Sequence, residues 1–370
     1  MKANWYHLLN ESAVDSPALL VFPDRVKMNI NRMIEMIGDV SRLRPHIKTH
    51  KTEEGVKLMM DQGIKKFKCA TIAEAELLGL CHAPDVLLAY QPVGPKIKRF
   101  ATLIKKYPQT RFSCLTDNRK AAEEMSEVFI AENLKVNVYI DLNVGMNRTG
   151  IAPGPEAYKL YQFCAIHKGL QPVGLHAYDG HFRNPDFAER KAACEKGFES
   201  VVDLQKALID LGFEKPLIIA GGSPTFPVHV MHEIAECSPG TCIFWDKGYA
   251  DLCKEQPFEP ATVLLTRVIS LPTSTRVTLD LGHKSVAAEN EITKRVYFPG
   301  AKELIPVGQS EEHLVMEAPE GHHYQPGDVL YGIPYHICPT VALYEKLTVI
   351  ENGMPAGEWK VLARSRQLTV

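Results

Sequence analysis

The sequence predicts an α/β protein in which a (β/α)8 TIM-type barrel is followed by a C-terminal β-rich domain. Short apolar runs alternate with longer segments whose apolar residues recur every three or four positions, as in strands and helices around a parallel sheet. This alternation repeats about every 25 to 30 residues, the spacing typical of a barrel. After about residue 260, β-branched segments separated by Pro and Gly replace it, which indicates a β-rich domain.

The barrel region contains nine strand candidates, one more than a barrel needs, and the first is the surplus one. The candidates are 18–22, 41–48, 66–71, 85–90, 111–116, 135–141, 170–178, 216–220 and 242–245. Helical patterns lie between them, at 52–62, 73–81, 95–106, 117–133, 155–168 and 186–211. A doubly wound open sheet is the alternative, but no GxGxxG motif follows the first strand.

These patterns divide the chain into three expected parts. Residues 1–17 form an N-terminal segment that joins the β domain region, 18–260 form the barrel, and 261–370 form the β domain. The length of 370 residues suits a large barrel plus an appended module.

Composition excludes several classes of function. The net charge is -2, with no basic excess for nucleic acid and no polybasic block for a membrane surface. No apolar run reaches the roughly 18 residues of a membrane-spanning helix, and the N-terminus lacks the pattern of a signal peptide. The nine cysteines include no CxxC pair, which favours reduced thiols. We therefore expect a cytoplasmic, soluble protein without nucleic-acid or membrane partners.

Residues 44–51, with the sequence RPHIKTHK, carry the most unusual group of side chains. A strand ends here and a helix begins near Thr52, so these residues belong at the C-terminal mouth of the barrel, where active sites lie. A lysine such as Lys48, desolvated beside the cations Arg44 and Lys51, can act as a nucleophilic amine. The alternative is a solvated basic patch before a helix.

Other polar groups follow strands. The glycine-bearing segments 220–225 and 238–241 can bind a phosphate through backbone N–H groups and hydroxyls, although such clusters are commonly simple turns. Arg148 lies in the flexible segment GMNRTG after one strand, and the segment HAYDGH, residues 176–181, ends the next.

In the β domain, residues 335–340 read YHICPT. If this segment is a strand, His336 and Cys338 face the same side and can bind one metal ion, and nitrogen with thiolate suits Zn²⁺. His313, in the segment SEEH, is a candidate third ligand or supporting group. The alternative is that the HxC pair is structural.

Together these segments resemble the D-threonine aldolase and D-serine dehydratase group, which are pyridoxal-phosphate enzymes with the alanine-racemase-type barrel and a β domain. The matching stretches span roughly residues 44 to 340 in the order of the group. They are RPHIKTHK, GMNRTG, HAYDGH, GGSPT, SPGT, DLGHK, SEEH and HICPT.

The resemblance implies a role for each matched residue. Lys48 would bind pyridoxal 5'-phosphate covalently, and Arg148 would approach the phenolic oxygen of the cofactor. His176 and Tyr178 would hold its ring. The phosphate would be bound by Gly221, Gly222, Ser223, Gly240 and Thr241, and a divalent metal beside the cofactor by His336 and Cys338. The first strand would join the β domain, and the site would be shared between the subunits of a homodimer.

The implied chemistry has two routes. With a metal on the β-hydroxyl, a base, for which we nominate His181, drives Cα–Cβ cleavage to glycine and an aldehyde. Alternatively, Lys48 removes the Cα proton and the hydroxyl leaves, which gives a 2-oxo acid and ammonia, as in a D-serine or 3-hydroxyaspartate dehydratase. Cys338 favours Zn²⁺ and the dehydratases, whereas a carboxylate there would suit Mn²⁺ and the aldolases.

The segment DLGHKSVAAE departs from the dehydratase pattern and leaves His283 unexplained, so the aldolase is the preferred interpretation. A racemase could use Tyr331 or Tyr335 but needs no HxC pair. A non-enzymatic pyridoxal-phosphate carrier would lack the β domain. The small D-amino acid that serves as substrate stays open.

Overall fold

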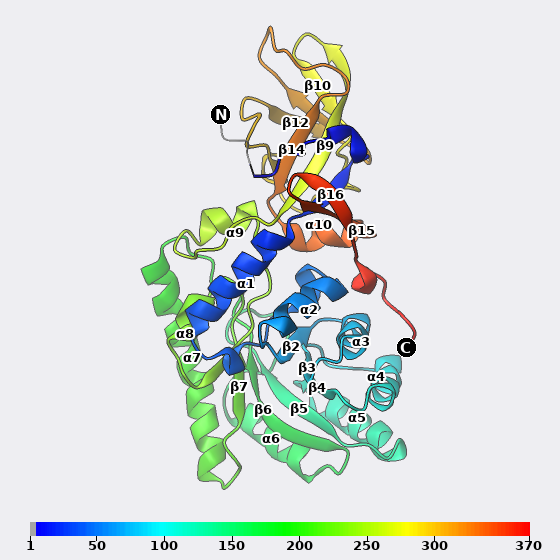
Figure 1. Ribbon diagram of the computed structural model, residues 1–370. Helices are drawn as coiled ribbons and strands as arrows, with labels where there is room; N and C mark the ends of the chain where they lie inside the picture. Colours follow the sequence, from blue (N-terminus) through cyan, green and yellow to red (C-terminus); the bar gives the residue numbers. More distant parts are fainter. Residues whose placement is uncertain (1–4) are drawn as a thin grey trace. The chain divides into compact units, whose positions relative to one another are not determined.

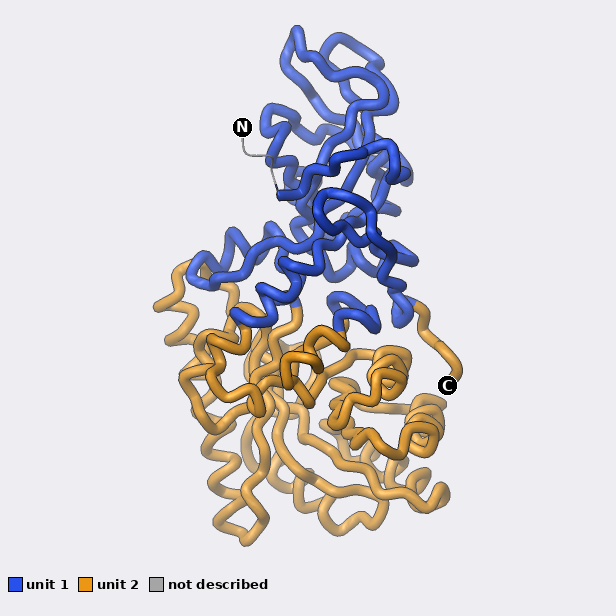
Figure 2. The backbone as a smooth tube through the Cα atoms, in the orientation of Figure 1, with its two compact units in different colours: residues 1–32, 49–55, 241–364 blue, residues 33–48, 56–240, 365–370 orange. Residues whose placement is uncertain are grey.

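The computed structural model describes residues 5–370 and contains two compact units. The first comprises residues 1–32, 49–55 and 241–364, and the second residues 33–48, 56–240 and 365–370 (Figure 2). The chain passes between the units several times, whereas the domain limits expected from the sequence were contiguous. We call the first the β unit and the second the barrel unit.

The barrel unit contains a parallel sheet of seven strands in the order β2-β3-β4-β5-β6-β7-β8 (Figure 1). The strands are β2 (Lys66–Cys69), β3 (Asp85–Leu88), β4 (Arg111–Thr116), β5 (Val136–Leu142), β6 (Leu170–Ala177), β7 (Leu217–Ala220) and β8 (Ala235–Cys237). Single bridges from Leu43 to Cys237 and from His46 to Lys68 connect the two edges. The segment around residues 43–46 therefore closes the sheet into a barrel, which confirms the predicted fold class.

Two predicted strands need correction. Residues 41–48 form only the two isolated bridges, since Pro45 offers no N–H and short 3-10 helices, Val40–Arg42 and Ile47–Thr49, flank it. Residues 242–245 form a turn rather than a strand, and Trp245 has a φ of 47°, which no strand residue adopts. The four residues are all buried, which explains the apolar pattern that predicted a strand. The last barrel strand is β8.

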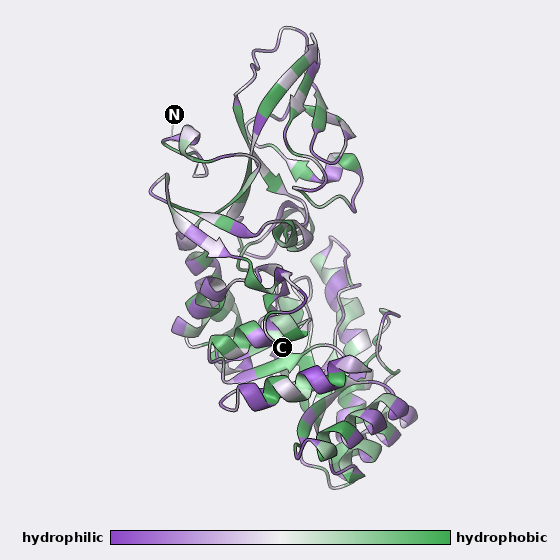
Figure 3. Ribbon diagram, turned by 90° about the vertical axis from the view of Figure 1, so that its right-hand side faces the viewer, coloured by the Kyte–Doolittle hydropathy of each residue, from purple (hydrophilic) through white to green (hydrophobic). Residues whose placement is uncertain are grey.

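Helices follow the strands of the barrel unit and cover its outside (Figure 1). Most combine hydrophilic and hydrophobic residues, as Figure 3 shows, so that one side packs on the sheet. Capping side chains fix several starts: Thr71, Asn118 and Asp186 accept hydrogen bonds from backbone N–H groups of the first turn. The helices are α3 (Ile72–Leu80), α4 (Pro95–Lys106), α5 (Arg119–Ala131), α6 (Pro155–Ile166), α7 (Phe187–Asp210) and α8 (Phe226–Val230), and α1 (Pro23–Ile37) and α2 (Glu53–Asp61) include residues of both units.

The β unit is built on a nine-stranded sheet with the central order β12-β13-β10-β9-β1-β15-β16, while β14 pairs with β9 and β11. The surplus strand of the sequence analysis is β1, which pairs antiparallel with β9 and parallel with β15, as the resemblance implied. The strands are β1 (Ala18–Val21), β9 (Thr262–Thr273), β10 (Arg276–Leu279), β11 (Val296–Tyr297), β12 (Ile305–Gln309), β13 (Leu314–Glu317), β14 (Val329–Pro334), β15 (Lys346–Glu351) and β16 (Met354–Lys360), with the short helices α9 (Lys247–Leu252) and α10 (Ile337–Leu343).

Each unit has its own apolar core. In the β unit, Tyr6, Leu8 and Val14 of the N-terminal segment pack with residues of β1, β9 and β14. In the barrel unit, Leu87, Leu115, Tyr139 and Ile219 form a buried cluster inside the sheet. Residues 1–4 of the predicted N-terminal segment lie outside the described residues.

Candidate active site

The barrel unit contains a cavity of about 550 Å³ at the C-terminal ends of its strands. Four residues singled out in the sequence line this cavity: Lys48, Arg148, His176 and Tyr178. They come from three separate segments of the chain, and the parallel sheet brings them together because its strands all end at one edge. Asp141, Lys68 and Arg366 also line the cavity.

Tyr178 lies among three cationic side chains. The Nζ atoms of Lys48 and Lys68 are 5.6 and 5.5 Å from the centre of its ring, and the guanidinium carbon of Arg148 is 4.9 Å from it. Cations this close to an aromatic ring are attracted by its electron-rich face. The cavity therefore combines two amines and a guanidinium with an aromatic surface, which suits an anionic ligand that carries a flat ring.

Lys68 is a site residue that the sequence analysis missed. Its side chain is only 2% exposed, and its Nζ lies 3.1 Å from His176 Nε2. Burial and the charge of Lys48 lower the pKa of Lys68 to about 7. One signal was present in the sequence: Lys68 stands between the apolar residues Phe67 and Cys69 in a short strand.

His176 connects Lys68 to Asp141. Its Nδ1 lies 2.7 Å from Asp141 Oδ1, so Nδ1 carries the hydrogen and Nε2 accepts one from Lys68. Burial lowers the pKa of His176, and Lys68 lowers it further. Burial alone would raise the pKa of Asp141, but the hydrogen bond from His176 holds it below its ordinary value. The imidazole is therefore neutral, with a fixed tautomer, between a carboxylate and an amine.

Arg44 does not act as a neighbouring cation for Lys48, contrary to the sequence analysis. It is fully buried and pairs with Asp85 and Glu236, at 2.5 and 2.7 Å. Burial alone would lower the pKa of its guanidinium, but these two carboxylates raise it above its ordinary value. Arg44 therefore belongs to a structural ion-pair network inside the barrel. The cation that interacts with Lys48 is Lys68, whose pKa the charge of Lys48 lowers.

The loop after β7 offers backbone N–H groups of the kind that bind phosphate. Gly221 has a φ of 79°, and a Cβ on it would lie 2.7 Å from His229 Cδ2, so only glycine fits. The hydroxyl of Ser223 accepts a hydrogen bond from Gly240 N at 3.2 Å, which joins the two predicted phosphate segments within the barrel unit. Ser238 Oγ is buried and has no hydrogen-bond partner among residues 5–370. Thr241, the last predicted phosphate ligand, belongs to the β unit.

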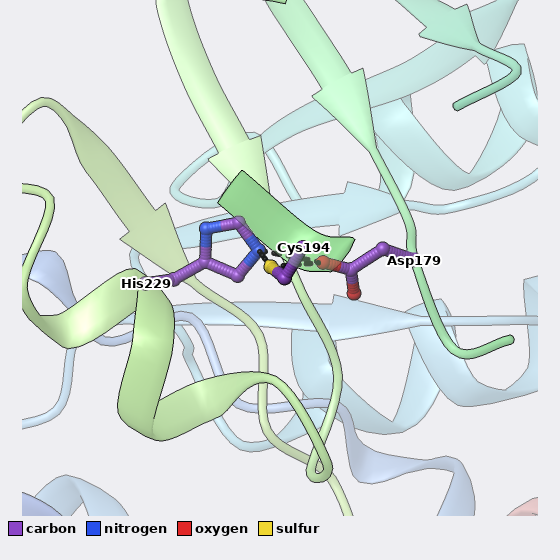
Figure 4. A group of neighbouring side chains, drawn as sticks. All are labelled: Asp179, Cys194 and His229. Atoms are coloured by element: carbon purple, nitrogen blue, oxygen red, sulfur yellow. Dashed lines mark hydrogen bonds and ion pairs between the residues drawn. The ribbon is translucent and has the colours of Figure 1, made fainter. Parts of the chain in front are cut away.

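A buried cluster of Asp179, Cys194 and His229 supports this loop (Figure 4). His229 Nε2 is 2.7 Å from Asp179 Oδ2, and Cys194 Sγ is 3.3 Å from the same oxygen. Asp179 Oδ1 accepts a hydrogen bond at 2.6 Å from the hydroxyl of Thr225. This hydroxyl in turn accepts a hydrogen bond from the backbone N–H of Gly222 at 3.2 Å. The residue types suit a metal site. However, burial and Asp179 raise the pKa of the Cys194 thiol, which disfavours the thiolate that binds metals, and hydrogen bonds already connect the three side chains.

His181, nominated as the catalytic base, is not among the residues that line the described cavity. Its ring packs against Phe182 at 4.0 Å and lies close to Gly145. Its Nδ1 is buried without a hydrogen-bond partner in the described part of the chain. Its role stays a prediction.

The metal candidates lie in the β unit, in a different local structure from the one predicted. His336 caps the start of α10 and Cys338 lies in its first turn, so they are not on a strand. Pro339 is tolerated there because the first helical turn needs no N–H donor. The side chain of His336 still forms a hydrogen bond with that of Cys338. Burial alone would lower the pKa of His336, but its hydrogen bonds with Cys338 and Glu289 and the nearby charges raise it to about 9.

Hydroxyl groups surround the thiol of Cys338, with Thr49 Oγ1 at 3.1 Å and Thr241 Oγ1 at 3.6 Å. His336 Nδ1 contacts Glu289, the last residue of the segment DLGHKSVAAE, which departs from the dehydratase pattern. His313 and His283 are exposed. Within residues 5–370, His336 and Cys338 belong to no group of three close metal-binding side chains.

Comparison with known proteins agrees with the fold. Residues 21–247 match the family description of the alanine racemase N-terminal domain, which covers more than half of the chain. The chain belongs to this family. Residues 261–350 match the description of a serine dehydratase domain.

Relatives of known activity extend over nearly the whole chain. A D-threonine aldolase of Arthrobacter sp is 26% identical over 360 residues, which cover 95% of this chain and 93% of the relative. A 3-hydroxy-D-aspartate aldolase of Paracoccus denitrificans is 25% identical, covering 97% and 94%. The crystal structure of D-threonine aldolase from Filomicrobium marinum is 26% identical, with a TM-score of 0.88, covering 97% of this chain and 98% of that one. The predicted group and an enzymatic role are thereby confirmed.

Among residues 5–370, no helix has both the length and the apolar composition that crossing a membrane would require.

Proposed function

We propose that the protein is a pyridoxal-phosphate- and divalent-metal-dependent lyase that cleaves β-hydroxy D-amino acids between Cα and Cβ, in the manner of a D-threonine aldolase. The observation that carries this proposal is the cavity that places Lys48 with Arg148, His176 and Tyr178 at the strand ends. The full-length likeness to two aldolases of β-hydroxy D-amino acids supports it.

The residues of the barrel unit fit the cofactor. Lys48 supplies the amine, Arg148 supplies a cation, and Tyr178 offers an aromatic surface, all lining one cavity. Gly221, Gly222, Ser223, Gly240 and Thr241 are the phosphate ligands we propose, and the tight approach at Gly221 with the unpartnered Ser238 hydroxyl suits a bound anion. When bound, the cofactor supplies an electron sink for the bond that breaks at Cα.

The chain's own groups control protons in this cavity. Lys68, with its pKa lowered to about 7, holds or releases a proton at Nζ near neutral pH. Asp141 fixes the tautomer of His176, so that Nε2 always presents a lone pair to Lys68. We assign to His181 the acceptance of the β-hydroxyl proton.

In the β unit, His336 and Cys338 are the metal ligands we propose. A nitrogen and a thiolate suit Zn²⁺ best, with Mn²⁺ the second choice. The metal would coordinate the β-hydroxyl of the substrate and lower its pKa. One solved relative, a D-threo-3-hydroxyaspartate dehydratase, is described in a metal-free form, which supports a metal in this group.

A dehydratase is the second candidate, and a specific observation favours it. Residues 261–350 match a serine dehydratase domain, and the thiol of Cys338 lies within that match. β-Elimination would use the same residues but would give a 2-oxo acid and ammonia. A racemase is third, because it has no use for the pair of His336 and Cys338.

We further propose a cytoplasmic homodimer that acts on a small D-amino acid, with neither nucleic acid nor membrane as a partner. Light scattering of the purified protein should report twice the chain mass. A fully active monomer would contradict a site that needs both subunits.

Two variants test the cofactor and metal assignments. Lys48→Ala should lose the near-visible absorbance of bound pyridoxal phosphate, while the control Lys51→Ala keeps it. If Lys48→Ala retains the band and Lys51→Ala loses it, the assignment of Lys48 is wrong. Cys338→Ala should lose activity that added Zn²⁺ cannot restore, while it keeps the cofactor absorbance. Full activity of this variant in the presence of a chelator would exclude the metal site.

A further inference from the structure

A second cavity, of about 360 Å³, adjoins the first one in the barrel unit. The two cavities share the lining residues Ala70, Thr71, Tyr90 and Arg366. The second therefore continues the first away from Lys48, beyond the ends of β2 and β3. Its lining also includes the apolar side chains of Ile72, Leu88 and Pro92.

The charged side chains of this second cavity are all cationic. Lys96, Arg99 and Arg366 line it, and no Asp or Glu does so among the described residues. Lys96 Nζ donates a hydrogen bond to Tyr90 Oη at 3.0 Å, which leaves its charge without an anion. Arg99 Nε is buried and has no hydrogen-bond partner in the described part of the chain. Such a cluster attracts an anion, because like charges held together at an apolar surface are costly unless one is bound.

Arg366 is held in place by the chain around it. Arg99 Nη2 donates hydrogen bonds to the backbone oxygens of Arg366, at 3.1 Å, and of Val370, at 2.7 Å. The backbone N–H groups of Thr369 and Val370 donate to Glu76 Oε2 at 3.0 and 3.1 Å. These hydrogen bonds hold the backbone of residues 366–370, and the exposed side chain of Arg366 lines both cavities.

We propose that the second cavity is the subsite for an anionic group on the side chain of the substrate, bound by Arg366 and Lys96. The substrate class is then a β-hydroxy D-amino acid with a carboxylate at or beyond Cγ, rather than a neutral one such as D-threonine. This inference rests on the proposed function, because the substrate is placed by its amino group near Lys48. Of the cations of the first cavity, Lys48 and Arg148 are assigned to the cofactor and Lys68 is hydrogen-bonded to His176, which leaves Arg366 and Lys96 for the side chain.

A length series of substrates tests this subsite with the holoenzyme. The values of kcat/KM are measured for D-threonine, 3-hydroxy-D-aspartate and 3-hydroxy-D-glutamate. We expect the wild type to prefer at least one of the two dicarboxylates over D-threonine by about tenfold or more, the effect of one charged hydrogen bond. Arg366→Gln should remove this preference by lowering kcat/KM about tenfold more for the preferred dicarboxylate than for D-threonine, whereas Arg366→Lys should keep part of the preference.

Lys98→Gln is the matched control, since Lys98 is exposed on the same helix as Lys96 but does not line the cavity. It should leave kcat/KM for all three substrates unchanged, while Lys96→Gln lowers kcat/KM more for the dicarboxylates than for D-threonine. If D-threonine is cleaved and Arg366→Gln affects the three substrates equally, the subsite is wrong although the proposed function stands. If none of the three is consumed, the proposed function itself fails.

A binding measurement separates recognition from turnover. Calorimetric titration of the holoenzyme with glutarate should show binding that weakens about tenfold or more in Arg366→Gln and is unchanged in Lys98→Gln. Equal affinity of the wild type and Arg366→Gln for glutarate would overturn the assignment of Arg366. Titration with inorganic phosphate shows whether the subsite takes any anion: phosphate binding as tight as that of glutarate would refute a carboxylate side-chain site.

Discussion

Replacing Lys68 with methionine should stabilise the protein, and by an amount that depends on pH. Burial and Lys48 lower the pKa of Lys68 from its ordinary value of 10.5 to about 7. Between these two values the unfolded chain binds the proton and the folded chain does not. Burying the amine of Lys68 therefore lowers the free energy of unfolding by its full amount below pH 7 and by nothing above pH 10.5. Because each pKa unit is worth about 1.4 kcal/mol, the full cost is about 5 kcal/mol.

Urea unfolding of the cofactor-free protein at pH 6 and pH 9.5 measures this difference. At pH 6 the whole cost of Lys68 is present, and at pH 9.5 only about 1 kcal/mol of it remains. Lys68→Met should therefore gain about 3 kcal/mol more over the wild type at pH 6 than at pH 9.5, on an order-of-magnitude scale. The change in packing is common to both pH values and cancels. Lys65→Met, at an exposed neighbouring position, should show no such difference. An equal effect of Lys68→Met at both pH values would refute a buried amine with a lowered pKa.

Two further predictions concern the loop and the barrel interior. Gly221→Ala should weaken pyridoxal-phosphate binding about tenfold or more in a fluorescence titration, because its Cβ meets the ring of His229. Gly63→Ala, which has the same backbone strain but open space, is the control and should bind normally. Asp85→Ala should lower the free energy of unfolding by about 3–5 kcal/mol in urea, because it removes one partner of the buried Arg44. A loss below about 1 kcal/mol would show that Glu236 alone satisfies Arg44.

Much of the barrel could be predicted because its signals are local. The strands from 66–71 to 216–220 and the helices between them are each marked by periodicity, and polar residues at their ends indicate the mouth. The segment 41–48 was expected as a full strand, but Pro45 limits it to two bridges. Residues 242–245 were expected as a strand because a short run of buried apolar residues has the same sequence pattern whether its backbone is extended or forms a turn.

The candidate site was predictable only where a motif carried it. Lys48, Arg148, His176 and Tyr178 each stand in a recognisable segment, and they line one cavity. Lys68 stands in no motif, and its contact with His176 joins β2 to β6, two strands that are adjacent neither in the sequence nor in the sheet.

Two other features depend on contacts across the fold. Arg44 looked like an activating cation because its partners, Asp85 and Glu236, lie on strands that only the closed barrel brings near. Glu289, the contact of His336, is not singled out by the sequence analysis and lies 47 residues earlier in the chain. Pairings of this kind follow from topology rather than from any local pattern.

Product analysis tests the central claim most directly. The purified protein, with pyridoxal phosphate and either Zn²⁺ or Mn²⁺, is offered D-threonine and 3-hydroxy-D-aspartate, and glycine, the aldehyde, the 2-oxo acid and ammonia are measured together. Cleavage between Cα and Cβ predicts glycine and the corresponding aldehyde in equal amounts, without ammonia. A 2-oxo acid with stoichiometric ammonia would contradict the aldolase and establish the dehydratase.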